Sequence, residues 1–166
     1  MQYGVEVSVW RLARDPEDND VVLLRDASGR RLPIWIGQWE ALAIWMKLAR
    51  NSGSFVRRPM THDLFATVLE RLGANLERVV VDDYSNCTYY AKLHLRLNGQ
   101  TFAVDCRPSD GIALALRAGA PIMVAEEVMA SAPQIEEVDE AGEAGEVEEP
   151  VEPDEPDEID PNPDLP

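Results

Sequence analysis

The sequence predicts an α+β fold in which two similar β-β-β-α units are separated by one inserted helix. Three observations support this prediction. Short segments alternate apolar with polar residues, as half-buried strands do, and three longer segments place apolar residues at helical spacing. An ungapped shift of 70 residues aligns two parts of the chain. The C-terminal part, 128–166, holds 15 acidic and no basic residues, so we predict one domain over 1–127 followed by a disordered acidic tail over 128–166.

The negative charge of the chain is concentrated in this tail. The formal net charge is −16, but the 15 basic residues all lie between Arg11 and Arg117, so the predicted domain is nearly neutral. This excludes a strongly basic DNA-coating protein. Two cysteines, Cys87 and Cys106, exclude a disulfide-rich scaffold. The chain shows neither a signal-peptide pattern nor the roughly 18 apolar residues of a membrane span, so we expect a cytoplasmic protein without membrane contact.

The aligned parts define two units, about 3–50 and 75–118, with a helix over 61–73 between them. The alignment keeps turn glycines, helix-start acids and helix-end bases in the same order. The matched pairs include Leu23 and Leu93, Gly29 and Gly99, Glu40 and Asp110, Ala43 and Ala113, and Lys47 and Arg117. We interpret this agreement as a tandem duplication.

The first unit begins with a strand, because Val5, Val7 and Val9 alternate with polar residues. A hairpin follows, and apolar residues occupy both of its faces. We expect Val21, Leu23, Ile34 and Ile36 on the inner face and Val22, Leu24 and Trp35 on the outer face. A sheet that is apolar on both faces needs a second cover, which could be the other unit or another subunit. We predict a homodimer, because symmetric dimers are the commonest oligomers.

The second unit contains the stronger hairpin signal, Asn98-Gly99, because both residues tolerate the positive φ of a two-residue turn. This turn creates a wholly apolar inner face that pairs Leu95 with Phe102, Leu93 with Val104, and Ala91 with Cys106. Helices are expected over 38–50, 61–73 and 109–118, where apolar residues recur at helical spacing.

Three segments resemble the bifunctional nuclease family, a bacterial and plant group credited with both RNase and DNase activity. They are LPIWIGQWEALAI (32–44), RPMTHDL (58–64) and RPSDGIALALRAGAPI (107–122). The resemblance covers roughly 5–127 and implies a duplicated α+β unit with nuclease activity. Gly111 departs from the pattern, since the family more often has Ala there.

The residue types that phosphodiester hydrolysis needs occur within or beside these three segments. The reaction requires an activated water and stabilisation of charge at phosphorus, supplied either by carboxylates holding a divalent metal such as Mg²⁺ or by a histidine with a basic clamp. The candidate catalytic residues are Asp110, His62, Asp105 and Glu40, and the candidate nucleic-acid-binding residues are Arg107, Arg57 and Arg58.

Each candidate also has a purely structural interpretation. The carboxylates of Asp110 and Glu40 could serve solely to stabilise helix dipoles. Asp105 could pair with Lys92 across the sheet, and His62 could be exposed without a role. The four tryptophans could stack on bases, but we expect them to pack in the core or an interface. The leading function is therefore a nuclease that acts on RNA and/or DNA, and the alternative is a non-catalytic regulatory module that binds a nucleic acid or a protein.

Overall fold

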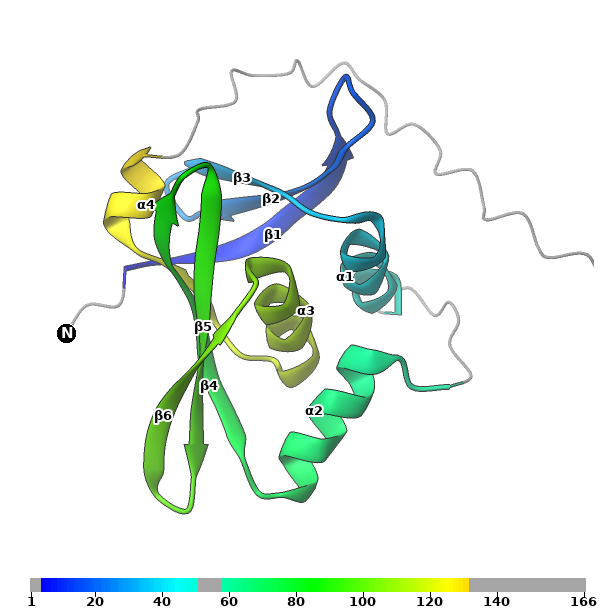
Figure 1. Ribbon diagram of the computed structural model, residues 1–166, viewed down its shortest axis with the longest axis vertical. Helices are drawn as coiled ribbons and strands as arrows, with labels where there is room; N and C mark the ends of the chain where they lie inside the picture. Colours follow the sequence, from blue (N-terminus) through cyan, green and yellow to red (C-terminus); the bar gives the residue numbers. More distant parts are fainter. Residues whose placement is uncertain (1–3, 51–57, 132–166) are drawn as a thin grey trace, which may run out of the picture. The chain divides into compact units, whose positions relative to one another are not determined.

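The computed structural model describes residues 4–50 and 58–131, which form a mixed α+β structure (Figure 1). Seven strands make one sheet in the order β3-β2-β1-β7-β4-β5-β6. The strands are β1 (Val5–Arg14), β2 (Asp20–Asp26), β3 (Arg31–Trp35), β4 (Asn75–Ser85), β5 (Thr88–Leu97), β6 (Gln100–Cys106) and β7 (Ile122–Val124). The helices are α1 (Gln38–Arg50), α2 (Thr61–Arg71), α3 (Pro108–Ala118) and α4 (Glu126–Ser131). No helix in these two ranges is long and apolar enough to cross a membrane.

Both halves of the sheet follow the predicted order of three strands and a helix. β1, β2 and β3 precede α1, and β4, β5 and β6 precede α3, with α2 between the halves. Residues matched by the shift of 70 lie on corresponding elements, such as Glu40 in the first turn of α1 and Asp110 in the first turn of α3. The short strand β7 joins the halves, running antiparallel to β1 and parallel to β4. The duplication stays our interpretation of this repeated order.

The second hairpin has the predicted register. Leu95 lies opposite Phe102, and Leu93 opposite Val104. The inner face pairs apolar residues as predicted, but its part on β6 is not covered, because Phe102 and Val104 are exposed. α3 packs against β4 and β5, so the edge strand β6 extends beyond the helical cover.

The first hairpin is shifted by one residue from the prediction. Val22 lies opposite Ile34 and Leu24 opposite Leu32, and all four belong to the main core. A shift of one residue exchanges the two faces of a strand, so Val22 and Leu24 are inner rather than outer residues. Their burial within one chain removes them as an argument for the predicted homodimer, whereas Trp35 stays exposed.

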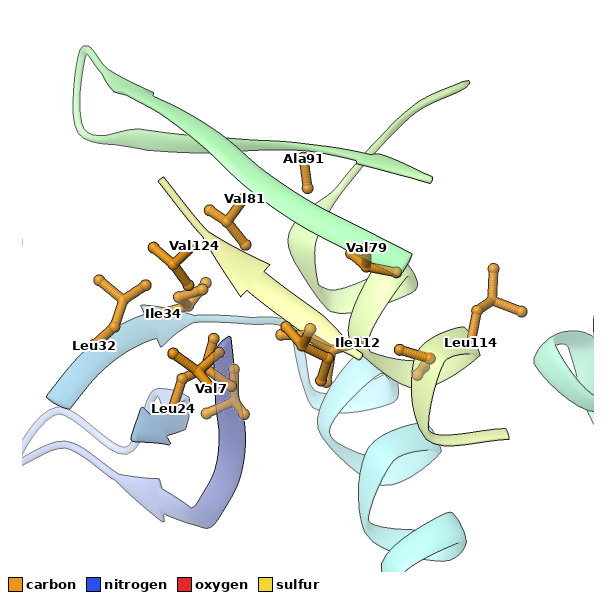
Figure 2. Packing of buried hydrophobic residues seen from close by; sticks show 14 of the residues in the cluster. Val7, Leu24, Leu32, Ile34, Val79, Val81, Ala91, Ile112, Leu114 and Val124 are labelled. Atoms are coloured by element: carbon orange, nitrogen blue, oxygen red, sulfur yellow. The ribbon is translucent and has the colours of Figure 1, made fainter. Parts of the chain in front are cut away.

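Apolar side chains from both halves meet in one core (Figure 2). Val7 and Leu24 come from the first half, Val79 and Val81 from the second, and Ile112 of α3 joins the same cluster. Together they tie both halves of the sheet to the helix that carries Asp110. Figure 1 shows α1, α2 and α3 gathered on one side of β4 and β5.

α4 crosses the boundary predicted between residues 127 and 128. Val128 and Met129 are buried in the core, so they belong to the fold rather than to the tail. A helix of six residues, EEVMAS, carries too little periodicity to be recognised beside an acidic segment. The rest of the predicted tail, 132–166, lies outside the described residues.

α2 exposes most of its apolar stripe. Leu64, Phe65, Val68 and Leu72, here called the α2 stripe, are all exposed, and no residue of α2 is fully buried. α2 therefore contacts α3 mainly through its other side chains, which include Ala66 and Leu69.

Candidate active site

The first turns of three helices meet at one place in the structure. Glu40 of α1 binds Arg107 Nη1 at 2.6 Å. Arg107 stands just before α3 and donates two hydrogen bonds to Asp110, from Nε at 2.7 Å and from Nη2 at 3.1 Å. Asp110 Oδ1 lies 3.1 Å from His62 Nε2 of α2. These four residues form one connected group, called here the helix-start cluster.

Local sequence explains why these side chains converge. Pro108 occupies the start of α3, where its missing N–H costs no helical hydrogen bond, and Arg107 precedes it in an extended conformation. At α1, the Ala41 N–H donates to the Gly37 carbonyl. A Cβ at Gly37 would collide with the Glu40 carboxylate. Glycine at 37 therefore lets Glu40 fold back over the helix start toward Arg107.

The protonation states in the cluster follow from its hydrogen bonds. Partial burial alone would raise the pKa of Asp110, but the hydrogen bonds from Arg107 and His62 outweigh it and hold this pKa below its ordinary value. Asp110 is therefore ionised at neutral pH and can only accept hydrogen bonds. The hydrogen bond is therefore donated by His62 Nε2–H, an arrangement in which a neutral imidazole has its lone pair on Nδ1. Hydrogen bonds to the carboxylates of Asp110 and Glu40 raise the pKa of Arg107.

The cluster is open to solvent at its basic member. The Arg107 side chain is 65% exposed, whereas those of Glu40 and His62 are each 18% exposed. A guanidinium has five N–H donors, and three of those of Arg107 are used by the two carboxylates. Two donors of an exposed cation are thus left for a ligand beside an oriented histidine.

The structure unites four of the seven predicted site residues. It separates Asp105 from them, because Asp105 lies opposite Lys92 on the face of the sheet turned away from α3. Lys92 in turn forms an ion pair with Asp82. The proposed catalytic role of Asp105 is therefore not supported, and its predicted pairing with Lys92 agrees with the strand register. Arg58 is exposed and outside the cluster, and Arg57 lies outside the described residues.

Sequence reasoning missed the pair that holds α2 in place. Arg117 Nε donates to Asp63 Oδ1 at 2.8 Å, and its two other nitrogens donate to the carbonyls of Ala113 and Ala43. Asp63 also accepts the N–H of Met60 at the start of α2. Arg117 of α3 thus links its own helix to α1 and α2. Its partner on α2, Asp63, is the residue that follows His62. The repeat alignment of Lys47 with Arg117 marks this position in the sequence, but it does not show that Asp63 is the partner of Arg117.

A metal-binding role for the cluster does not fit its geometry. Among the described residues, no three His, Cys, Asp or Glu side chains are grouped so that they could hold a metal ion. Glu40 and Asp110, the two carboxylates of the cluster, instead share the guanidinium of Arg107. An ion bound between them would have to displace Arg107.

Comparison with known proteins assigns the chain to a family. The model of the bifunctional nuclease domain matches residues 22–137, which is more than half of the chain. The chain belongs to the bifunctional nuclease domain family. It is 45% identical over 118 residues to the uncharacterized protein Rv1829 of Mycobacterium tuberculosis, a match that covers 70% of this chain and 68% of that protein.

More distant members of the family carry nuclease names. Bifunctional nuclease 1 of Oryza sativa subsp. indica is 28% identical over 124 residues, which are 72% of this chain and 37% of the rice protein. Bifunctional nuclease of Oryza minuta gives the same values. The resemblance predicted from the three segments is therefore confirmed at the level of the family.

Packing explains the glycine that departs from the family pattern. A Cβ at Gly111 would lie 2.7 Å from Val79 Cγ1 and 3.3 Å from Cys106 Sγ. Glycine therefore lets the first turn of α3 approach β4 closely.

Proposed function

We propose that this protein is a nuclease that hydrolyses phosphodiester bonds of RNA and/or DNA, with the helix-start cluster as its catalytic site. The observation that carries the proposal is the alignment of His62, Asp110 and Arg107. A carboxylate orients the imidazole, and an exposed guanidinium lies on the same carboxylate. Membership of the bifunctional nuclease domain family supports the same reaction class.

His62 acts as the general base in this proposal. Its Nδ1 accepts a proton from the attacking water while the water oxygen forms the new bond to phosphorus. The leaving oxygen then takes a proton from the imidazolium as its bond to phosphorus breaks, which restores neutral His62. Asp110 keeps the ring in the required tautomer and stabilises the transient positive charge, as a carboxylate beside a catalytic histidine does.

Arg107 and the helix starts stabilise the phosphate. The two remaining N–H donors of Arg107 suit the non-bridging oxygens, whose negative charge is present throughout the reaction. The N-termini of α1, α2 and α3 add positive dipole ends at the same place. Glu40 holds the guanidinium in position through Nη1, whereas Asp110 accepts from Nε and Nη2.

Turnover distinguishes this proposal from a non-catalytic regulatory module. The full-length protein should cleave labelled RNA or single-stranded DNA over many turnovers, and His62→Ala should lower the rate by about 10²- to 10⁴-fold, the usual range for a general base. The assay should be run with Mg²⁺ and with EDTA, because a divalent metal is one of the two routes that the sequence leaves open. Binding without cleavage under both conditions would favour the regulatory module. A cytoplasmic location remains part of the proposal and calls for fractionation of cells.

A further inference from the structure

A tryptophan surrounded by arginines lies on the first three strands, away from the helix-start cluster. The guanidinium carbons of Arg11, Arg25 and Arg31 lie 4.6, 5.8 and 4.4 Å from the centre of the Trp10 ring. Arg25 and Arg31 face each other directly across β2 and β3. Trp10 occupies an irregularity between Val9 and Arg11 on β1, where an extra residue re-aims a side chain. These four residues are called here the tryptophan–arginine patch.

The three arginines of the patch lack acidic partners within the described part of the chain. Arg14, Arg30, Arg96, Arg107 and Arg117, by contrast, each form at least one ion pair with a carboxylate. Three like charges on neighbouring strands repel one another. Contacts with the indole face offset part of this repulsion. A surface built in this way is complementary to a polyanion.

Within the described residues no carboxylate forms an ion pair with the guanidinium groups of the patch. A guanidinium that stacks on a ring keeps its N–H donors at its edge, in its own plane. Arg11 and Arg25 are exposed, and Arg31 is half-buried. Bidentate binding of phosphate oxygens needs this arrangement of free in-plane donors. The same donors bind carboxylates as well as phosphates, so it is the three neighbouring cations that favour a chain of anionic groups over a single anion.

Exposed aromatic rings follow the patch along the chain. Trp35 shares the face of β3 that carries Arg31, about 13 Å away at the usual rise of a strand, and its side chain is anchored by a hydrogen bond from Nε1 to Asp15. Trp39 follows in the first turn of α1, next to Glu40 of the cluster. Trp35 is 47% exposed and Trp39 is 74% exposed, so neither packs in the core of the chain, and packing in an interface stays a prediction.

We propose that the tryptophan–arginine patch is a second binding surface, specific for single-stranded nucleic acid. Phosphates of the nucleic acid bind Arg11, Arg25 and Arg31. Unpaired bases stack on Trp35 and Trp39 as the nucleic-acid strand continues toward the helix-start cluster. Bases of a single strand expose the π faces that stacking needs. The inference rests on the proposed function, because that function makes the helix-start cluster the place toward which the nucleic-acid strand runs. Binding at the patch itself does not require cleavage.

Fluorescence anisotropy with a labelled oligothymidylate tests the proposal in the full-length protein carrying His62→Ala. Arg25→Gln and Arg31→Gln should each raise the dissociation constant about three- to tenfold at 50 mM salt and lower the slope of log K against log salt by about 0.7. Trp39→Ala should raise it about 5- to 100-fold without changing the slope. The control is Arg14→Gln, which removes the same charge from an arginine already paired with Asp18.

Unchanged affinity in Arg25→Gln and Arg31→Gln, or an equal loss in the control, would overturn the patch. Competition by polyglutamate as effective as that by unlabelled oligothymidylate would overturn the choice of nucleic acid and indicate an acidic protein segment instead. These outcomes are independent of catalysis. Full cleavage activity in His62→Ala would contradict the proposed catalytic site and leave the binding result unaffected.

Discussion

The buried pair Arg117–Asp63 should contribute more to stability than any exposed ion pair of the protein. The Arg117 side chain is 5% exposed and that of Asp63 is 12% exposed. Arg117→Met removes three hydrogen bonds, one to Asp63 and two to backbone carbonyls of α3 and α1. Methionine fills a similar volume but takes the guanidinium away from a largely buried carboxylate. Breaking a buried pair in this way costs about 3–5 kcal/mol.

Urea denaturation followed by tryptophan fluorescence measures this cost as a change in the free energy of unfolding. Arg14→Met is the matched control, because Arg14 binds Asp18 at a similar distance, 2.9 Å, with both side chains exposed. It should cost about 0–1 kcal/mol. Adding Asp63→Asn to Arg117→Met should recover about 1 kcal/mol or more, because asparagine removes the buried charge and keeps an acceptor for the start of α2.

A loss below about 1 kcal/mol in Arg117→Met would refute this reasoning. A strictly additive further loss in the double variant would refute it as well. It would show that removing the Asp63 charge changes the free energy of unfolding equally with and without Arg117. The expected loss is a large share of the roughly 5–15 kcal/mol that stabilises a typical domain. The equilibrium should therefore be measured at low temperature, where the variant stays folded.

Three further outcomes are expected. Gly37→Ala should displace the Glu40 carboxylate from the guanidinium it holds, which lowers nuclease turnover about tenfold or more but changes the melting temperature little. Burial alone would raise the pKa of Asp26, but hydrogen bonds from Arg30 and Ser28 outweigh it and lower this pKa to about 2. Wild type should therefore exceed Asp26→Asn in free energy of unfolding by up to about 2 kcal/mol. In melts at acid pH this difference should be complete above pH 4 and shrink toward pH 2. The homodimer stays a prediction, for which the α2 stripe is the better-placed surface; sedimentation should show a dimer at tens of micromolar, and a monomer there would contradict it.

Local signals explain which parts of the fold could be predicted. Asn98-Gly99 fixes its turn by backbone conformation alone, so the register of β5 and β6 follows from the sequence. The first hairpin turns instead around Asp26, whose buried carboxylate accepts hydrogen bonds from Ser28 and Arg30. That arrangement depends on side-chain hydrogen bonds within 26–30 and has no equally strong dipeptide signature, and the resulting error of one residue exchanged the two faces of β2.

The candidate site was predictable to the extent that helix starts are. Glu40, His62 and Asp110 each stand in the first turn of a helix that the sequence indicates, and their convergence follows from the helices packing together. Asp105 was misplaced because it is close to Asp110 in sequence but on the other face of the sheet. The partner of Arg117 could not be foreseen, because Asp63 lies on another helix 54 residues away.

The two histidines of the chain allow the most direct test of the catalytic site. His62 binds Asp110 in the helix-start cluster, whereas His94 lies on the opposite face of the sheet, near Arg78. The decisive measurement is the ratio of kcat/KM for RNA cleavage by His62→Gln and by His94→Gln, each in the full-length protein. His62→Gln should lower kcat/KM at least 100-fold more than His94→Gln. Equal losses, or a greater loss in His94→Gln, would contradict the placement of catalysis at the helix-start cluster.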